Sequence, residues 1–130
     1  MATIKSYTDL EQSKKLTKIL PLESADMRIG NYVGKSGEVD GTNIHYYTKG
    51  ESFGAPEIIE AWSLASLLSV LPMITKGKDT ANPFITKTPD NEYYVVYATL
   101  TKEVDSSAIY DNPLDACYEM ILKLHELKML

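Results

Sequence analysis

Two prolines divide the chain into helical and extended segments, because each ends a run with helical hydrophobic spacing. The sequence reads LTKILP from Leu16 to Pro21 and LLSVLP from Leu67 to Pro72. Proline cannot continue a helix, and it pushes the residue before it toward extended geometry. The similarity of these two segments has two interpretations: an ancient duplication, or two separate helices with the same stop signal. The flanking residues do not match, which favours two helix ends.

Three helices are expected from start signals and hydrophobic periodicity. The first follows Thr8, which we interpret as its N-cap and as half of a capping box with Glu11. The second opens at Ser63 and carries leucines at 64, 67, 68 and 71, the spacing of one helical face. The third has the strongest start signal, with Asn112 as N-cap and Pro113 at the first helical position.

Extended segments separate these helices. One or two strands with turns are expected from Met27 onward, with an Asp-Gly turn at 40–41. The polar stretch TKGKDTANP reads as a connection. A hairpin should follow, with Phe84–Thr88 paired to Tyr93–Leu100 around a Pro-Asp-Asn turn. We therefore predict an α+β fold over residues 1–130 as a single globular domain: a small antiparallel sheet packed on one face by about three helices.

Composition and charge exclude several classes of protein. The net charge is −5 and Arg28 is the one arginine, so we expect no nucleic-acid binding, which needs clustered basic residues. The longest mostly apolar run, 61–74, is too short to cross a bilayer, and the N-terminus lacks the apolar core of a secretory signal. One cysteine, Cys117, permits no intrachain disulfide. We expect an acidic cytoplasmic protein with no membrane partner.

Two histidines are the candidate titratable groups. His125 should project near the middle of the apolar stripe of the third helix, either as a base in a pocket or as a residue favoured near a helix C-terminus. Cys117 lies about 12 Å from it along the axis, too far for a nucleophile–base pair, and is interpreted as a core residue. His45 lies in the segment NIHYYT.

No motif of a known catalytic, metal or cofactor site is present. The chain contains no P-loop, no G-x-G-x-x-G, no G-x-S-x-G and no paired Cys or His spacing. Glu23 and Asp26 could form an acid pair, but a solvated loop explains them more simply. We therefore assign no catalytic residue, metal or cofactor.

Tyrosine is the unusual component, with nine Tyr against two Phe and one Trp. Adjacent tyrosines on a strand point to opposite faces, so some rings should lie outside the core. They could form a recognition surface, since tyrosine brings contact area at low entropy cost, or simply cover a half-solvated sheet. The candidate partner-binding residues are Tyr46, Tyr47, Tyr93, Tyr94 and Tyr97.

About half of the chain resembles small uncharacterised proteins of gut bacteria and of their phages or mobile elements. The similarity lies in YTDLEQSKKLTKILPLESADM, WSLASLLSVLP and DNPLDACYEMILKLHELKML. It implies a bacterial or phage accessory protein and carries no catalytic residue to this chain.

Three hypotheses for function follow. The leading one is a non-enzymatic protein-interaction module that binds a protein partner and self-associates as a homodimer through exposed strand edges. The alternative is a small ligand-binding protein or enzyme, in which folding brings His45 or His125 to a carboxylate. The third is an acidic mimic of nucleic acid, for which the charge is modest and mixed with lysines.

Overall fold

The computed structural model describes residues 5–31, 44–48, 57–76, 79–98 and 103–130, and these form an α+β fold. The helices are α1 (Leu10–Leu16), α2 (Leu64–Val70) and α3 (Pro113–Glu126), with a short 3-10 turn, η1, at Leu22–Ser24. The α+β prediction is confirmed, and the described strands form two antiparallel sheets, one of three strands and one of four.

The chain divides into two compact units. One unit comprises Tyr7–Ser66, and the other comprises Met1–Ser6 with Leu67–Leu130. The boundary falls within α2, whose first turn belongs to the first of these units. The single-domain organisation stays a prediction.

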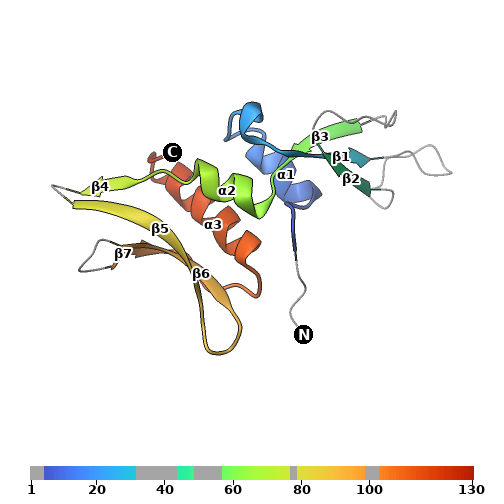
Figure 1. The fold of residues 1–130 in the computed structure, drawn as a ribbon. Helices are drawn as coiled ribbons and strands as arrows, with labels where there is room; N and C mark the ends of the chain where they lie inside the picture. Colours follow the sequence, from blue (N-terminus) through green and yellow to red (C-terminus); the bar gives the residue numbers. More distant parts are fainter. Residues whose placement is uncertain (1–4, 32–43, 49–56, 77–78, 99–102) are drawn as a thin grey trace. The chain divides into compact units, whose positions relative to one another are not determined.

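The Tyr7–Ser66 unit contains the three-stranded sheet, ordered β2–β1–β3 (Figure 1). Its strands are β1 (Met27–Asn31), β2 (Ile44–Thr48) and β3 (Glu57–Ala61). Met27 and Ile29 of β1 lie opposite Ala61 and Ile59 of β3, and α1 packs against β3. Strands from Met27 onward are thus confirmed, while the Asp-Gly turn at 40–41 lies outside the described residues.

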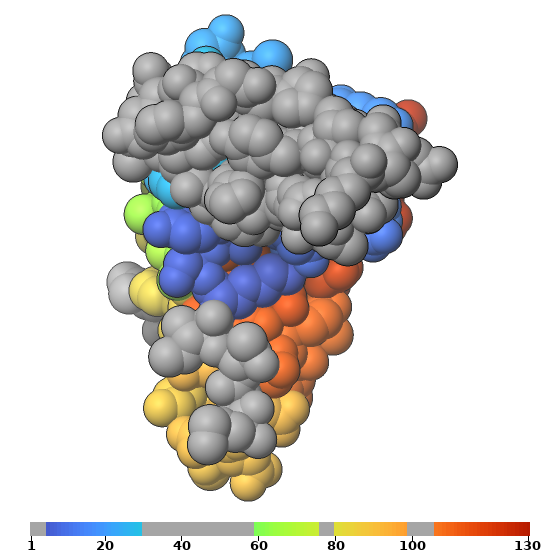
Figure 2. Space-filling view, turned by 90° about the vertical axis from the view of Figure 1, so that its right-hand side faces the viewer, coloured from blue at the N-terminus to red at the C-terminus, as the bar shows by residue number. Residues whose placement is uncertain are grey.

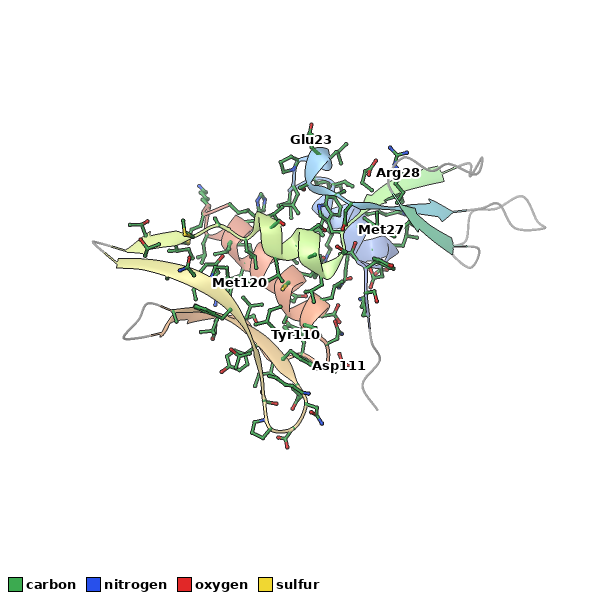
Figure 3. The ribbon with its side chains drawn as sticks, in the orientation of Figure 1. Glu23, Met27, Arg28, Tyr110, Asp111 and Met120 are labelled. Carbon is green, nitrogen blue, oxygen red and sulfur yellow. The ribbon has the colours of Figure 1, made fainter. Side chains whose placement is uncertain are left out.

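Alternation along β1 separates an apolar from a charged face. Met27, Ile29 and Ala61 form a buried cluster, against which Tyr7 and Leu10 pack. Arg28 points the other way, as Figure 3 shows beside Met27, and its Nε lies 3.3 Å from Oε1 of its cross-strand neighbour Glu60. Cross-strand pairs of opposite charge favour one register, and a shift by one residue would expose the apolar set.

The N-terminus of α1 differs by one residue from the expectation. Asp9, and not Thr8, is the N-cap: its side chain accepts the backbone N–H of Gln12 at 2.8 Å, and Gln12 Oε1 accepts the N–H of Asp9 at 3.1 Å. The predicted Thr8–Glu11 capping box is therefore wrong. The Thr8 hydroxyl accepts instead the backbone N–H of Trp62, and Thr8 N–H donates to the Trp62 carbonyl.

The other unit contains the sheet β4–β5–β6–β7 and helix α3 (Figure 1). The strands are β4 (Ile74–Lys76), β5 (Asp79–Lys87), β6 (Tyr93–Ala98) and β7 (Glu103–Ser106). Helix α3 lies against β6 on one face of this sheet. The buried face of α3 includes Leu114, Cys117, Met120, Ile121 and Leu124, among which Met120 is labelled in Figure 3.

The predicted hairpin is confirmed, with β5 longer than expected. Lys87 pairs with Tyr93 and Asn82 with Ala98, and Asn91 in the turn takes a positive φ of 61°, which Asn tolerates better than most residues. The segment Asp79–Pro83, expected to be part of a connection, forms the first half of β5. The predicted start of the third helix is also confirmed, because Asn112 Oδ1 accepts the N–H of Asp115 at 2.8 Å.

Candidate interaction surface

The two faces of the β5–β6 hairpin differ in character. On one face Val95 and Tyr97 of β6 are completely buried, and their cross-strand neighbours Ile85 and Pro83 are half-buried. This is the face against which α3 packs, as the burial of Val95 and Tyr97 requires. The opposite face carries the intervening residues of both strands.

The face opposite α3 is apolar at its centre. Phe84 is 52% exposed and lies directly across from Val96, while Thr86 lies across from Tyr94. Val96, Tyr94 and Thr86 are half-buried. We call these four residues, Phe84, Thr86, Tyr94 and Val96, the open face. A large aromatic side chain left half in solvent among other apolar groups is typical of a binding surface.

The turn of the hairpin borders the open face. The turn, residues 88–92, is closed by a hydrogen bond from the Thr88 N–H to the Glu92 carbonyl at 2.8 Å. It lies at the surface, in the gold part of Figure 2. The ring of Tyr93 lies on the other side of β6, with the ammonium of Lys87 5.9 Å from its centroid. Tyr93 also exchanges two backbone hydrogen bonds with Tyr110, which Figure 3 places beside α3. Tyr93 is therefore half-buried and lies outside the open face.

The tyrosines predicted to bind a partner have different environments. Tyr94 lies on the open face, as that prediction requires of a binding residue. Tyr97 is completely buried and its hydroxyl donates to the Pro72 carbonyl at 2.7 Å, so its assignment as a partner-binding residue is wrong. Tyr46 and Tyr47 lie on β2, opposite Ile29 and Arg28 of β1, and their side chains lie outside the described residues.

Of the two candidate histidines, the structure describes the side chain of His125 alone. His125 is exposed at the end of α3, so the expectation that it projects into the apolar stripe is wrong. The physical reason is that the sheet covers α3 only as far as Leu124, beyond which its last residues are in solvent. His45 pairs with Gly30 in the β2–β1 ladder. Within the described residues, no three His, Cys, Asp or Glu side chains group to hold a metal ion.

The single cysteine is a core residue, as predicted. Cys117 is completely buried in α3, and burial raises the pKa of its thiol to about 12. Burial, together with the negative charge that Cys117 would carry as a thiolate, also raises the pKa of Tyr97 to about 12. Both groups are neutral near pH 7, and a neutral thiol is a poor nucleophile.

Asp26 belongs to a structural hydrogen-bond network. Its two carboxylate oxygens accept the backbone N–H of Ser63, at 2.9 Å, and the Ser63 hydroxyl. Partial burial opposes ionisation of Asp26, but the hydrogen bonds from Ser63 outweigh it and lower the pKa of the carboxyl group. Ser63 Oγ in turn accepts the Ser66 N–H at the start of α2, as an N-cap does.

The same network holds the one tryptophan. Trp62 is completely buried, and its Nε1–H donates to Ser24 Oγ at 2.9 Å. Ser24 and Asp26 thus connect the segment after α1 to the segment before α2. This explains Asp26 without an acid pair: its carboxylate binds Ser63, whereas Glu23 is exposed on η1, as Figure 3 shows.

Sequence reasoning missed Phe84 and Val96. The signal was present in the hairpin register, because residues directly opposite each other share a face, and Phe84 and Val96 are equally far from the turn centre at Asp90. Counting outward from the turn places Tyr94 and Thr86 on the same face. The tyrosine content alone does not reveal this pattern.

The comparisons with known proteins return no relative: the chain matches no family model, no curated protein and no solved structure. Among the described residues, none of the helices has the length and apolarity needed to cross a bilayer.

Proposed function

We propose that this chain is a non-enzymatic protein-interaction module that binds a protein partner through the open face of its β5–β6 hairpin. The observation that carries the proposal is Phe84, an aromatic side chain 52% exposed in the middle of a regular sheet. About half of this side chain is already covered, so complete burial by a partner would gain roughly 1–1.5 kcal/mol.

The surroundings of Phe84 support a docking role. Val96 and Tyr94 extend the apolar surface along β6, and Thr86 contributes a hydroxyl that can pair at its rim. Interfaces combine such an apolar centre, rich in aromatic residues, with a polar rim. The sheet also gives the surface a fixed backbone, which lowers the entropy lost on binding.

The partner we propose has an apolar surface patch that accepts an aromatic ring. The resemblance to bacterial and phage accessory proteins makes a bacterial or phage protein the first partner to test. The cytoplasmic location of the chain also stays a prediction.

The test begins with capture and is decided by variants. Immobilised protein is exposed to bacterial lysate at two salt concentrations, and a retained protein is then titrated against wild type, Phe84→Ser and Val96→Ser. Truncation of a central apolar contact costs about 2 kcal/mol or more, so we expect affinity to fall about 30-fold.

The matched control is Glu92→Ser, which changes an exposed residue of the same hairpin. It should bind as wild type does, and its free energy of unfolding should match that of wild type within about 0.5 kcal/mol, because Glu92 is exposed. Phe84→Ser and Val96→Ser should still unfold in one cooperative transition, since neither side chain is fully buried. Equal retention by wild type and Phe84→Ser would overturn the proposal.

A further inference from the structure

The exposed side of the four-stranded sheet extends beyond the open face. Ala81 of β5 and Ile74 of β4 lie across from each other and are both buried, so they belong to the side that α3 covers. Thr80 and Thr75, the next pair in this register, therefore lie on the other side, where both are exposed. Asn82 is exposed on that side as well. We call Thr75, Thr80 and Asn82 the polar margin of the open face.

The open face and its polar margin carry no charged residue between them. Lys87, the charged residue of β5 whose side chain the structure describes, lies across from Tyr93 and so on the α3 side. In the strand register, charged residues border this surface at its ends: Glu92 in the hairpin turn, and Glu103 of β7 across from Ala98. Charged residues make up 24% of the chain, so their absence from this surface reflects placement and not composition.

A surface of this composition is suited to contact with a neutral partner. Interfaces differ from the rest of a protein surface in the loss of charge at their centre and the gain of aromatic residues, which Phe84 and Tyr94 supply here. The side chains of the polar margin are hydroxyls and an amide, each with both a donor and an acceptor. They can pair with neutral amides and hydroxyls, but they cannot neutralise a carboxylate or an ammonium group.

We propose that the partner of the open face docks through a surface that is itself uncharged, with apolar side chains over Phe84 and neutral amides or hydroxyls over the polar margin. The inference rests on the proposed function, because it names the chemistry of the protein that binds there. A charged side chain of the partner would lose its water at this surface without gaining an opposite charge, which costs free energy. Acidic and basic docking surfaces are thereby rejected.

A second copy of this chain is a poorer occupant than a different protein. Each copy has a net charge of −5, so two copies repel each other as they approach, and this surface holds no cation to offset the repulsion. A protein that is neutral or basic elsewhere meets no such repulsion and can present the same kind of neutral patch.

The experiment places a charge of either sign within the proposed contact. The protein retained from the lysate is titrated against the full chain carrying Asn82→Asp, Asn82→Lys or Asn82→Ser. Both charged variants should weaken binding by about tenfold or more, because each buries a charge without a counter-charge. Asn82→Ser stays neutral and should bind nearly as wild type does.

Two further variants match these changes in net charge away from the surface. Lys87→Gln makes the chain more negative, as Asn82→Asp does, and Glu126→Gln makes it more positive, as Asn82→Lys does. Lys87 lies on the α3 side and Glu126 at the end of α3, and both are exposed, so neither change should alter the affinity. The affinity of wild type should also change by less than about threefold between low and high salt, since the contact contains no ion pair to screen.

Urea unfolding shows whether the variants fold. All of them should keep one cooperative transition, because every changed residue is exposed. Thr80→Asp and Thr80→Lys repeat the comparison at a second exposed position of the polar margin, and both should weaken binding.

Unchanged or tighter binding in either charged variant at Asn82 would overturn the inference, and loss of affinity in Phe84→Ser alone would leave the proposed function standing. If neither Phe84→Ser nor the charged variants changed the affinity, or if no protein were retained, the proposed function itself would fail. A wild-type chain that sediments as a dimer, with the dimer lost in Phe84→Ser, would place a second copy on this surface and would also overturn the inference.

Discussion

Lys128 follows the last helix in a conformation that suits glycine. Its φ is 59°, its N–H donates to the His125 carbonyl at 3.0 Å, and the Met129 N–H donates to the Leu124 carbonyl at 2.8 Å. These two bonds form the Schellman motif, in which the left-handed residue is usually glycine because a Cβ is unfavourable there. Lys128 therefore stores a small amount of backbone strain at the end of α3.

We expect Lys128→Gly to raise the free energy of unfolding by about 0.5–1 kcal/mol, since relief of the strain exceeds the added entropy of the unfolded chain. Urea unfolding of wild type, Lys128→Gly and Lys128→Ala measures this. Lys128→Ala loses the charge but keeps the Cβ and should show no gain. If both variants gained equally in urea midpoint over wild type, loss of the charge, and not relief of the backbone strain, would be the cause of the gain.

Residue-level prediction succeeded where the signal was local and failed where a distant residue intervened. Asn112 was identified as an N-cap because its partner, Asp115, is three positions away. Thr8 has the right chemistry for a cap, yet its hydroxyl is used by Trp62, 54 positions further along the chain. Only the folded structure brings Trp62 to Thr8, so Asp9 takes the cap and the helix begins one residue later.

At the scale of elements, the start of α3 combines two strong features. Asn112 is nearly buried; its side-chain oxygen accepts the Asp115 N–H, and its side-chain amide donates to the carboxylates of Asp111 and Asp115. Pro113 follows at the first helical turn, where its missing N–H costs nothing. The helix that supplies much of this unit's core thus begins at a fixed residue.

Asn112→Ala should lower the free energy of unfolding by about 1–2 kcal/mol, because it removes the cap and the side-chain amide that donates to Asp111 and Asp115. Thermal and urea unfolding measure the loss. Asn112→Ser keeps a cap acceptor and should recover most of it. If the serine variant were as unstable as the alanine variant, the amide donors, and not the cap, would hold the helix start.

Elements were predicted well where residue types agreed with the local structure. The β-branched and aromatic segment of β6 formed the expected strand. The first half of β5 was missed because it contains Asp79, Asn82 and Pro83, which disfavour strands. It is extended because Ala81 pairs with Ile74 of β4 and is buried there, a contact between two segments that look polar in sequence.

At the scale of the whole molecule, the sequence predicted the class of fold but not the division of its strands into two sheets. Hydrophobic periodicity shows that a strand has a buried face, but the pairing of β1 with β3 and of β5 with β6 is a choice among many similar partners. The candidate surface shows the same limit. The hairpin register in the sequence could identify Phe84 as a residue of one face, but only the folded structure shows that this face is left exposed.

Ionisation of two buried groups should lower the stability of the molecule at alkaline pH. The Cys117 thiol and the Tyr97 phenol both have pKa values raised to about 12 by burial, from 9.0 and 10.0 in their unperturbed forms. Because the folded-state pKa values lie above the unfolded ones, the unfolded chain releases these protons first as the pH rises. Their contribution to stability is complete below about pH 9 and is lost progressively toward pH 12.

We therefore expect the urea midpoint to fall between pH 9 and pH 12, and to fall less steeply in Cys117→Ala. That variant should be less stable at pH 7 because it loses packing in the core. Its slope against pH reports the thiol together with the part of the Tyr97 shift that the thiolate causes, since every lysine and the other tyrosines titrate equally in both proteins. Parallel slopes for wild type and Cys117→Ala would mean that Cys117 ionises as readily in the folded chain as in the unfolded one, which its complete burial against the sheet argues against.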